Sequence, residues 1–542
     1  MSTPQTLSSF KEIEGLEVLD QAQAHEKYHR NTLGTSRIIR GALRPRRTED
    51  VQKIVVIANK HNIKLFAFST GHNWGFGSSL PTVDDCVIVD LSGMKRIVEF
   101  NEALGYVTLE PGVTQQDLYD YIVKNNLPFM VPTTGAGPTC SIIGNALERG
   151  YGLTPNIDHF AAMLALEAVL PNGQIYRSSF QEFGAGRSDK IYKWKIGPYL
   201  DGIFSQSNYG IVTQATIEIT RKPEHLGQFI AFIDQKNFQK VVSIVAGVKE
   251  RFGTMIGGVN LMNTHRLMAM VEKKKEWQVN GIVPEQHLHE LAKKRGIPDW
   301  AVLIGIYTPK ELMSPMKKHL FKEFGPYSKH KLFLTRGRLS FIEKILKFFP
   351  KLWINRTINT IDLAFQILEG TPNEVALPLA YLKNPHPLPD KNRHPDYDGC
   401  GLLWYCPLVP VDGSIAEKFT HGVKEICVSE EIEPMITLTT ISQRCFASNI
   451  PLVFNRDDKE QCERVYRCFN RLMTFAQELG LFPDRLDIET IRKLYDTVDA
   501  PVFDLALKIK EALDPKGILS PGRYMRVKNP RDAHSKGDNN SV

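Results

Sequence analysis

A histidine stands inside a glycine-rich loop, in the stretch FSTGHNWGFGSS at residues 68–79. Gly71, Gly75 and Gly77 surround His72. Glycine leaves room for backbone N–H groups to face a cavity, and successive N–H groups of this kind bind anions such as a pyrophosphate. The spacing G-x-x-x-G-x-G is neither the Rossmann nor the P-loop pattern, so a plain structural turn is the alternative to phosphate binding.

Strands and helices alternate around this loop, from about residue 37 to residue 221. Apolar residues at helical spacing predict a helix over Glu49–Asn62, and the short apolar run KLFAFST predicts a buried strand that leads into the loop. Thr114 is a suitable N-cap for a second helix. Asn172 and Gly173 fit the tip of a β-hairpin. The glycine-rich loop therefore follows a strand of an alternating α/β segment.

The chain from about Glu224 to Gly480 has strands separated by long amphipathic helices. This order is typical of an α+β domain built on an antiparallel sheet. Within it, the polar, Pro-rich segment 381–400 predicts a long loop. The apolar, lysine-flanked stretch Phe341–Ile354 predicts either a helix packed on the core or on a subunit partner, as in a homo-oligomer, or a helix on a membrane surface.

The composition restricts the class of protein. The 542 residues are 42% hydrophobic and 23% charged, which suits two or three globular domains. A net charge of +7 is too weak to indicate a nucleic-acid partner. No uncharged apolar run is long enough for a transmembrane helix, and the N-terminus lacks the apolar region of a secretory signal. The eight scattered cysteines form no CxxC pair, so we expect reduced thiols, no metal site and a cytoplasmic protein.

Several segments resemble the flavoprotein family of vanillyl-alcohol oxidase and p-cresol methylhydroxylase. FSTGHNWGFGSSLP is similar to the pyrophosphate loop of that family. YVTLEPGVTQQDLYDYIVKNNLP is similar to the strand, turn and helix that follow it, and IIGNALERGYGLTPNIDHF and GPYLDGIFSQSNYGIVTQATI are similar to two further flavin-contacting segments. LDPKGILSPGRY is similar to the C-terminal segment that returns to the flavin. WYCPLVPVDG is similar to a strand of the cap domain of that family. The resemblance therefore extends over most of residues 40–222, pieces of 400–456 and the end of the chain.

The resemblance implies an α+β protein. It consists of a two-subdomain PCMH-type FAD-binding domain and a cap domain with a large antiparallel sheet flanked by helices. The implied boundaries are an N-terminal extension at 1–36, the FAD-binding domain at 37–222, the cap at 223–495 and a C-terminal segment at 496–542 that returns to the FAD domain.

The same resemblance implies which residues bind the FAD. They lie in the pyrophosphate loop, in the flavin-contacting segments and near the C-terminus. They are Ser69, Thr70, Gly71, His72, Asn73, Gly75, Phe76, Gly77, Ser78, Pro111, Thr134, Gly135, Ser141, Gly144, Asn145, Gly152, Gly210, Ile211, Val212 and Arg523.

His72 departs from the vanillyl-alcohol-oxidase branch, which attaches its flavin through a histidine or tyrosine of the cap. Ala447 and Ser448 stand at the comparable cap positions here. The related berberine-bridge-enzyme branch has a histidine in this loop that bonds covalently to the flavin. We therefore expect a covalent link through His72, with a non-covalent hydrogen bond as the alternative. Cys140 is either a second tether, as in that branch, or a small packing residue.

Phenol-oxidising members hold the phenolate with a Tyr-Arg pair. The comparable segment, LGLFPDRLDIETIRKLYDT, has no such pair, and Asp484-Arg485 is the nearest substitute. Arg485 is then expected either to stabilise an anionic reduced flavin or to be an exposed residue at a helix start. A pocket for para-substituted phenols is accordingly less favoured.

Three further catalytic candidates come from position along the chain. Alternation in the strand ITLTTISQRCF places Arg444 on one face with Thr440, and Tyr405 lies on the neighbouring strand. Tyr151 follows Arg149-Gly150 in the second flavin-contacting segment. The alternatives are a core position for Tyr151 and a surface position for Arg444.

These features predict an FAD-dependent oxidoreductase, either an oxidase or a dehydrogenase. It would take a hydride from an activated C–H bond of an alcohol or an aromatic, benzylic-type small molecule and pass the electrons to oxygen or another acceptor. One alternative is an alcohol, sugar or alkaloid oxidase like the berberine branch. Another is a flavin-binding protein without catalysis.

Overall fold

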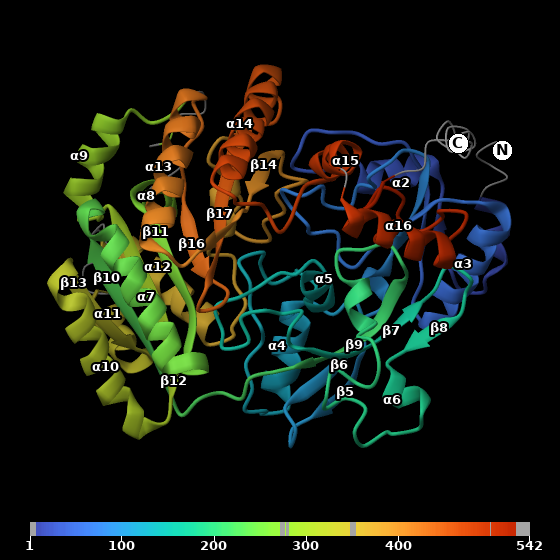
Figure 1. Ribbon diagram of the computed structural model, residues 1–542, viewed down its shortest axis with the longest axis horizontal. Helices are drawn as coiled ribbons and strands as arrows, with labels where there is room; N and C mark the ends of the chain where they lie inside the picture. The colour runs from blue at the N-terminus through green and yellow to red at the C-terminus, as the bar shows by residue number, and fades with distance from the viewer. Residues whose placement is uncertain (1–6, 272–276, 278–280, 347–353, 499, 527–542) are drawn as a thin grey trace, which may run out of the picture.

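A computed structural model describes residues 7–271, 277, 281–346, 354–498 and 500–526. The elements of the N-terminal part form two sheets, and those from residue 225 onward form a third (Figure 1). None of the described helices is both long and apolar enough to cross a lipid bilayer. All eight cysteines are free thiols.

The first sheet carries the strand that leads into the glycine-rich loop. Its order is β1 (Glu17–Leu19), β2 (Ile39–Arg44), β4 (Cys86–Asp90) and β3 (Leu65–Phe68). β2, β4 and β3 are parallel, and β1 pairs antiparallel with β2. The N-terminal segment, expected as an extension, therefore contributes a strand to this sheet.

The second sheet is antiparallel. Its order is β5 (Ile97–Asn101), β6 (Tyr106–Leu109), β9 (Ile211–Glu218), β7 (Met163–Val169) and β8 (Ile175–Arg177). Gly173 has a φ of +85° in the β7–β8 turn, a conformation that suits the predicted Asn-Gly tip.

Four helices of the N-terminal part pack on these two sheets. They are α2 (Gln21–Tyr28), α3 (Thr48–His61), α4 (Gln115–Lys124) and α5 (Ile142–Leu147), and the short α6 (Ser179–Glu182) follows β8. The apolar face of α3, including Val51 and Val55, packs in one core with Val87 of the first sheet and Val169 of the second. Thr114 caps α4 as expected, because its hydroxyl accepts a hydrogen bond from the N–H of Asp117.

The third sheet, which we call the cap sheet, is antiparallel throughout. Its order is β13 (Ser328–Thr335), β10 (His225–Ile233), β12 (Trp300–Thr308), β11 (Ile256–Asn263), β16 (Thr437–Thr440), β17 (Cys445–Asn455) and β14 (Cys400–Tyr405), with β15 (Leu408–Pro410) also paired to β17. The segment predicted as one strand up to Phe446 is instead two strands, because a turn at residues 441–444 separates β16 from β17.

Helices cover both faces of the cap sheet. One face packs against α7 (Phe238–Phe252), α10 (Lys310–Phe324), α13 (Gly413–Ser429) and α14 (Lys459–Glu478). The other face packs in part against α11 (Arg336–Leu346) and α12 (Ile354–Leu368), and α8 (Thr264–Val271), α9 (Glu285–Arg295) and the 3₁₀ turn η8 (Leu377–Tyr381) lie near it. In the stretch Phe341–Ile354, residues 347–353 lie outside the described residues, so the choice between packed and membrane-surface helix stays a prediction.

The chain returns to the first sheet at its C-terminal end. After α15 (Ile488–Thr497) and α16 (Pro501–Leu513), Leu519 runs parallel to Leu65 of β3. The Leu65 N–H donates to the Ile518 carbonyl at 2.7 Å, and the Ser520 N–H donates to the Leu65 carbonyl at 2.7 Å. In Figure 1, α16 accordingly lies among the N-terminal elements. The division into four segments expected from the sequence stays a prediction.

Candidate active site

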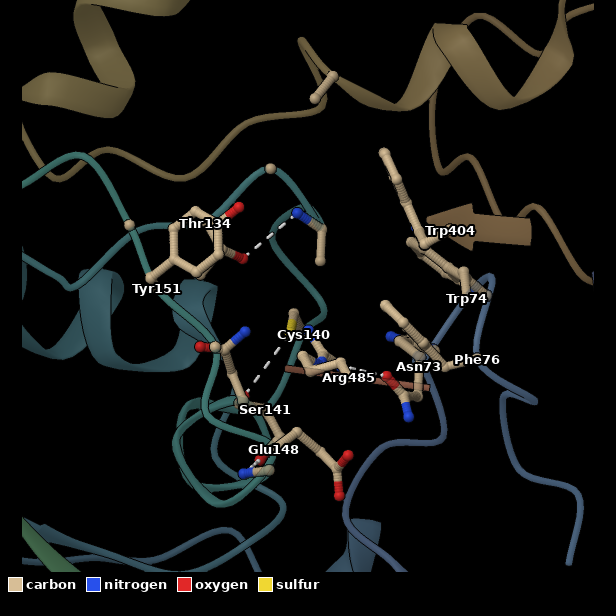
Figure 2. A pocket seen from close by; sticks show the side chains of 18 of the residues that line it. Asn73, Trp74, Phe76, Thr134, Cys140, Ser141, Glu148, Tyr151, Trp404 and Arg485 are labelled. Atoms are coloured by element: carbon tan, nitrogen blue, oxygen red, sulfur yellow. Dashed lines mark hydrogen bonds between the residues drawn. The ribbon is translucent and has the colours of Figure 1, made fainter. Parts of the chain in front are cut away.

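A cavity of about 460 Å³ lies between the loops of the N-terminal sheets and the cap sheet. The glycine-rich loop, residues 133–153 and the returning C-terminal segment form one side of it. Residues of β10, β11, β12, β16 and β17 and of α8 and α12 form the other side. Figure 2 shows Tyr151 and Thr134 across the cavity from Trp74 and Trp404. Segments far apart in the sequence thus line one cavity.

The glycine-rich loop offers free hydrogen-bond donors to this cavity. Residues 69–73 follow β3 and line the cavity, with Gly71 at a φ of +73°. Within the described part of the chain, the backbone N–H groups of Thr70, Gly71, His72 and Asn73 have no hydrogen-bond partner. Consecutive unpaired N–H groups around a left-handed glycine form a concave site for an anion.

Gly75 and Gly77, which were expected to bind the cofactor, do not line the cavity. Both have positive φ. A Cβ on Gly75 would lie 2.2 Å from Cδ1 of Trp404, and one on Gly77 would lie 2.6 Å from Cγ2 of Ile488. These glycines therefore allow Trp404 and Ile488 to approach the loop.

The His72 ring is enclosed by the loop and the cap. Its Nδ1 lies 3.1 Å from the Thr139 carbonyl, and its Nε2 lies 3.1 Å from Nε2 of His394. It stacks on Trp74 with ring centroids 4.9 Å apart. Burial, and to a lesser degree the nearby His394, lowers the pKa of His72 to about 3, so its imidazole is neutral at physiological pH.

Asp396 fixes the glycine-rich loop from the long loop before β14. Its carboxylate accepts a hydrogen bond from Ser78 Oγ at 2.7 Å and one from Trp74 Nε1 at 3.0 Å. Burial raises the pKa of Asp396 to about 7, although both hydrogen bonds act in the opposite direction. The sequence predicted this segment only as a loop.

Arg485 brings a positive charge to the cavity wall. Its Nη2 donates to Oδ1 of Asn73 at 2.8 Å, and its guanidinium carbon lies 4.2 Å from the centre of the Phe76 ring. Its Nε is buried and has no partner among the described residues. Cys140 lies beside it in Figure 2, and burial raises the pKa of that thiol to about 11. Cys140 is therefore a protonated thiol in the wall.

Tyr151 starts a row of hydrogen bonds along the cap side of the cavity. Its hydroxyl donates to Oδ1 of Asn449 at 2.7 Å. The Asn449 amide donates to Thr439 Oγ1 at 3.4 Å, which in turn donates to Asn260 Oδ1 at 2.7 Å. Burial raises the pKa of Tyr151 well above its usual value, so the phenol stays protonated and acts as a donor.

The expectation that Tyr405 and Arg444 face the pocket is wrong. Tyr405 is fully buried on the opposite face of β14, where its hydroxyl donates to the Leu472 carbonyl at 2.7 Å and its ring packs near Phe469. Arg444 is exposed, because it lies in the turn between β16 and β17 rather than on a strand. Neither lines the cavity.

The other expected cofactor residues line the cavity. They are Ser69, Thr70, Gly71, His72, Asn73, Phe76, Ser78, Pro111, Thr134, Gly135, Ser141, Gly144, Asn145, Gly152, Gly210, Ile211, Val212 and Arg523. Arg523 forms an ion pair with Glu148, and both side chains are largely buried.

Two features of this wall fit an FAD. The unpaired N–H groups of residues 70–73 suit the negative charge of a pyrophosphate. Gly144 brings the start of α5 against the loop, since a Cβ there would lie 2.8 Å from Ser69 Oγ. The donor set and the close backbone approach are those that a dinucleotide requires.

The cap contributes lining residues that sequence reasoning missed. They include Gln228, Asn260, Arg266, Trp404 and Asn449. A charged residue within the apolar run LMNTHRLMAMV was the available signal for Arg266. The others belong to apolar strands, where the sequence does not tell which face is turned to the cavity.

Comparisons with known proteins agree with this geometry. The sequence model of an FAD binding domain matches residues 39–179. The chain is 30% identical over 529 residues to the 1'-carboxy-chondrochloren decarboxylase of Chondromyces crocatus, with 96% of each chain covered. It is 27% identical over 481 residues to the flavoprotein subunit of 4-cresol dehydrogenase (hydroxylating) of Pseudomonas putida, covering 88% of this chain and 85% of that one. The crystal structure of p-cresol methylhydroxylase with substrate bound superposes with a TM-score of 0.85 at 24% identity over 97% of both chains. The expected fold class is thereby confirmed.

Proposed function

Because this chain belongs to the vanillyl-alcohol oxidase and p-cresol methylhydroxylase family of FAD-dependent oxidoreductases, we propose that it takes a hydride from an activated C–H bond of a small molecule. The observation that carries the proposal is the single cavity shared by the unpaired N–H groups of residues 70–73 and the polar row of the cap. An alcohol or an aromatic, benzylic-type compound is the substrate class that such a cavity suits, since most of its wall is apolar and few polar groups orient the ligand.

When bound, FAD supplies the hydride acceptor. The N–H groups of residues 70–73 would hold its pyrophosphate, and Ser78 and Trp74, fixed by Asp396, would keep the loop in place. Arg485 presents a positive charge that would stabilise negative charge developing in the cavity. Tyr151 would orient a polar group of the substrate through its hydroxyl.

The two curated relatives are named for different reactions, one a decarboxylase and the other a hydroxylating cresol dehydrogenase. Family membership therefore leaves the reacting bond open. A phenol-specific pocket is less favoured, because Asp484 and not tyrosine precedes Arg485.

The test of this proposal is reduction of the bound flavin. Purified protein is expected to carry FAD, and an anaerobic screen of benzylic and aliphatic alcohols is expected to yield a compound that bleaches its absorbance near 450 nm. Reoxidation by oxygen or by a dye then distinguishes an oxidase from a dehydrogenase. Bound FAD that no compound reduces, while dithionite does, would favour the catalytically silent alternative.

The covalent link through His72 is a finer part of the proposal. The His72 ring lines the cavity, which supports it, but both nitrogens are engaged by Thr139 and His394, so one must be released for a bond to form. Acid precipitation is the assay. Yellow colour that stays in the wild-type pellet and leaves with the His72→Ala supernatant supports the link. Colour that leaves the wild-type pellet excludes it and leaves FAD binding intact, and the same comparison with Cys140→Ala tests the second tether.

A further inference from the structure

Arg266 is a buried cation on the cap side of the cavity. It lies on α8 directly after β11, where Oδ1 of Asn263 accepts a hydrogen bond from its backbone N–H at 3.1 Å. The same Oδ1 accepts from the Ile436 N–H at 3.0 Å, so the start of α8 is fixed to the cap. Arg266 and Met270, one helical turn later, both line the cavity.

No residue in the described part of the chain forms an ion pair with the guanidinium of Arg266. The residue is only 9% exposed, and its Nε and Nη1 have no hydrogen-bond partner among the described residues. Burial lowers its pKa to about 10, which still leaves it protonated at physiological pH.

Each of the two other arginines in the cavity wall has a carboxylate nearby. Arg523 pairs with Glu148, and Arg485 donates to Asn73 and adjoins Asp484. The cavity that Arg266 lines has many apolar residues, among them Met262, Met270, Ala364, Ile367, Leu377 and Leu379. A buried cation without a partner lowers the stability of the folded state, so an anion that enters the cavity and pairs with it would relieve that cost.

We propose that the substrate carries one carboxylate and that Arg266 binds it, a statement that rests on the proposed function for the reaction itself. A guanidinium fork matches the two oxygens of a carboxylate, whereas a phenolate offers one oxygen. A phosphate dianion would bring a second negative charge, which a single guanidinium leaves uncompensated. Arg266 is thus a specificity-determining residue for an anionic substrate.

The experiment compares matched pairs of ligands on the purified holoenzyme. The probes are benzoate, phenylacetate and 3-phenylpropionate, each against its neutral primary amide, with 4-ethylphenol and phenyl phosphate as further arms. Dissociation constants are taken from perturbation of the flavin spectrum and from the shift in melting temperature. At least one carboxylate is expected to bind about tenfold or more tightly than its own amide.

The variants are Arg266→Met, Arg266→Lys and, as a matched control, Arg444→Met at an exposed position outside the cavity. R266M is expected to lose the preference for carboxylate over amide, R266K to keep part of it, and R444M to keep all of it. Ligand-free R266M is expected to melt at or above the wild-type temperature, because it replaces an unpaired buried charge.

The proposal is overturned if no carboxylate binds more tightly than its amide, if 4-ethylphenol or phenyl phosphate is the ligand that depends on Arg266, or if R266M keeps the preference. It is also overturned if R266M and R266K both melt well below wild type without ligand, since Arg266 would then be structural. Flavin content and reduction are measured in parallel. A protein without FAD refutes the proposed function. A rise in melting temperature with carboxylates that depends on Arg266 would then still support the carboxylate site.

Discussion

Replacing Asp396 with asparagine tests how the cap fixes the glycine-rich loop. The wild-type carboxylate has a pKa of about 7 in the folded protein and about 3.9 when unfolded. Because the folded-state pKa is the higher one, Asp396 contributes stability that is fully present below about pH 4 and is lost as the pH rises through about 7. Asparagine does not titrate, so D396N does not undergo this pH-dependent loss of stability.

The size of the effect follows from the same pKa values. Raising the pH from 5 to 8 lowers the free energy of unfolding by about 3 kcal/mol, because about two pH units of this range lie below the folded-state pKa. For a chain of 542 residues, with an unfolding entropy of about 2 cal/mol/K per residue, this corresponds to about 3 °C in melting temperature. Asparagine has one acceptor oxygen for the donors Ser78 and Trp74, which costs about 1 kcal/mol at every pH.

The assay is the melting temperature of D396N minus that of wild type, measured by tryptophan fluorescence from pH 5 to pH 8 at one scan rate. The difference is expected to move in favour of D396N by about 3 °C across this range. Asp390→Asn, in the same loop but exposed, is the matched control and is expected to show no trend. A difference for D396N that is flat across the range would refute the reasoning.

Three further substitutions test other parts of the site. Gly75→Ala is expected to lower the FAD content, because its Cβ would lie 2.2 Å from Trp404 at a φ of +78°; Gly247→Ala, with nothing within 4 Å, is the control, and full FAD content in G75A would contradict this account. Arg485→Met is expected to lower kcat/KM by about 100-fold while FAD stays bound; a change within twofold would remove Arg485 from the chemistry. Tyr405→Phe is expected to cost about 1 kcal/mol of stability through the lost bond to Leu472, with kcat unchanged; a tenfold lower kcat in a stably folded Y405F would return Tyr405 to the list of catalytic candidates.

Features encoded by neighbouring residues were predictable from the sequence. The strand before the glycine-rich loop, the Thr114 cap of α4 and the Asn172–Gly173 turn depend on contacts within a few positions, and each is present. The large antiparallel sheet also followed from the pattern of strands and helices. These features depend on local periodicity and turn chemistry.

Contacts between distant segments were not predictable in this way. Asp396 and Ser78 are 318 positions apart, and no local pattern joins them. Trp404 faces the loop while its neighbour Tyr405 faces the helices, because side chains alternate along a strand. In an apolar strand the sequence does not assign the two faces, and a single position separates the cavity from the core. The prediction that Arg444 lies on a strand was wrong for a related reason. A turn interrupts the alternation of side chains on which that prediction was based.

The pairing of Leu519 with Leu65 bears on how the protein is made. The glycine-rich loop follows β3. One edge of β3 pairs with Leu519, which is synthesised about 450 residues after Leu65. At ordinary rates of translation this interval lasts between about 20 and 90 s. For that time the nascent first sheet has an open edge next to an unfinished dinucleotide site, so we expect the cofactor to be loaded at the end of synthesis or after release from the ribosome.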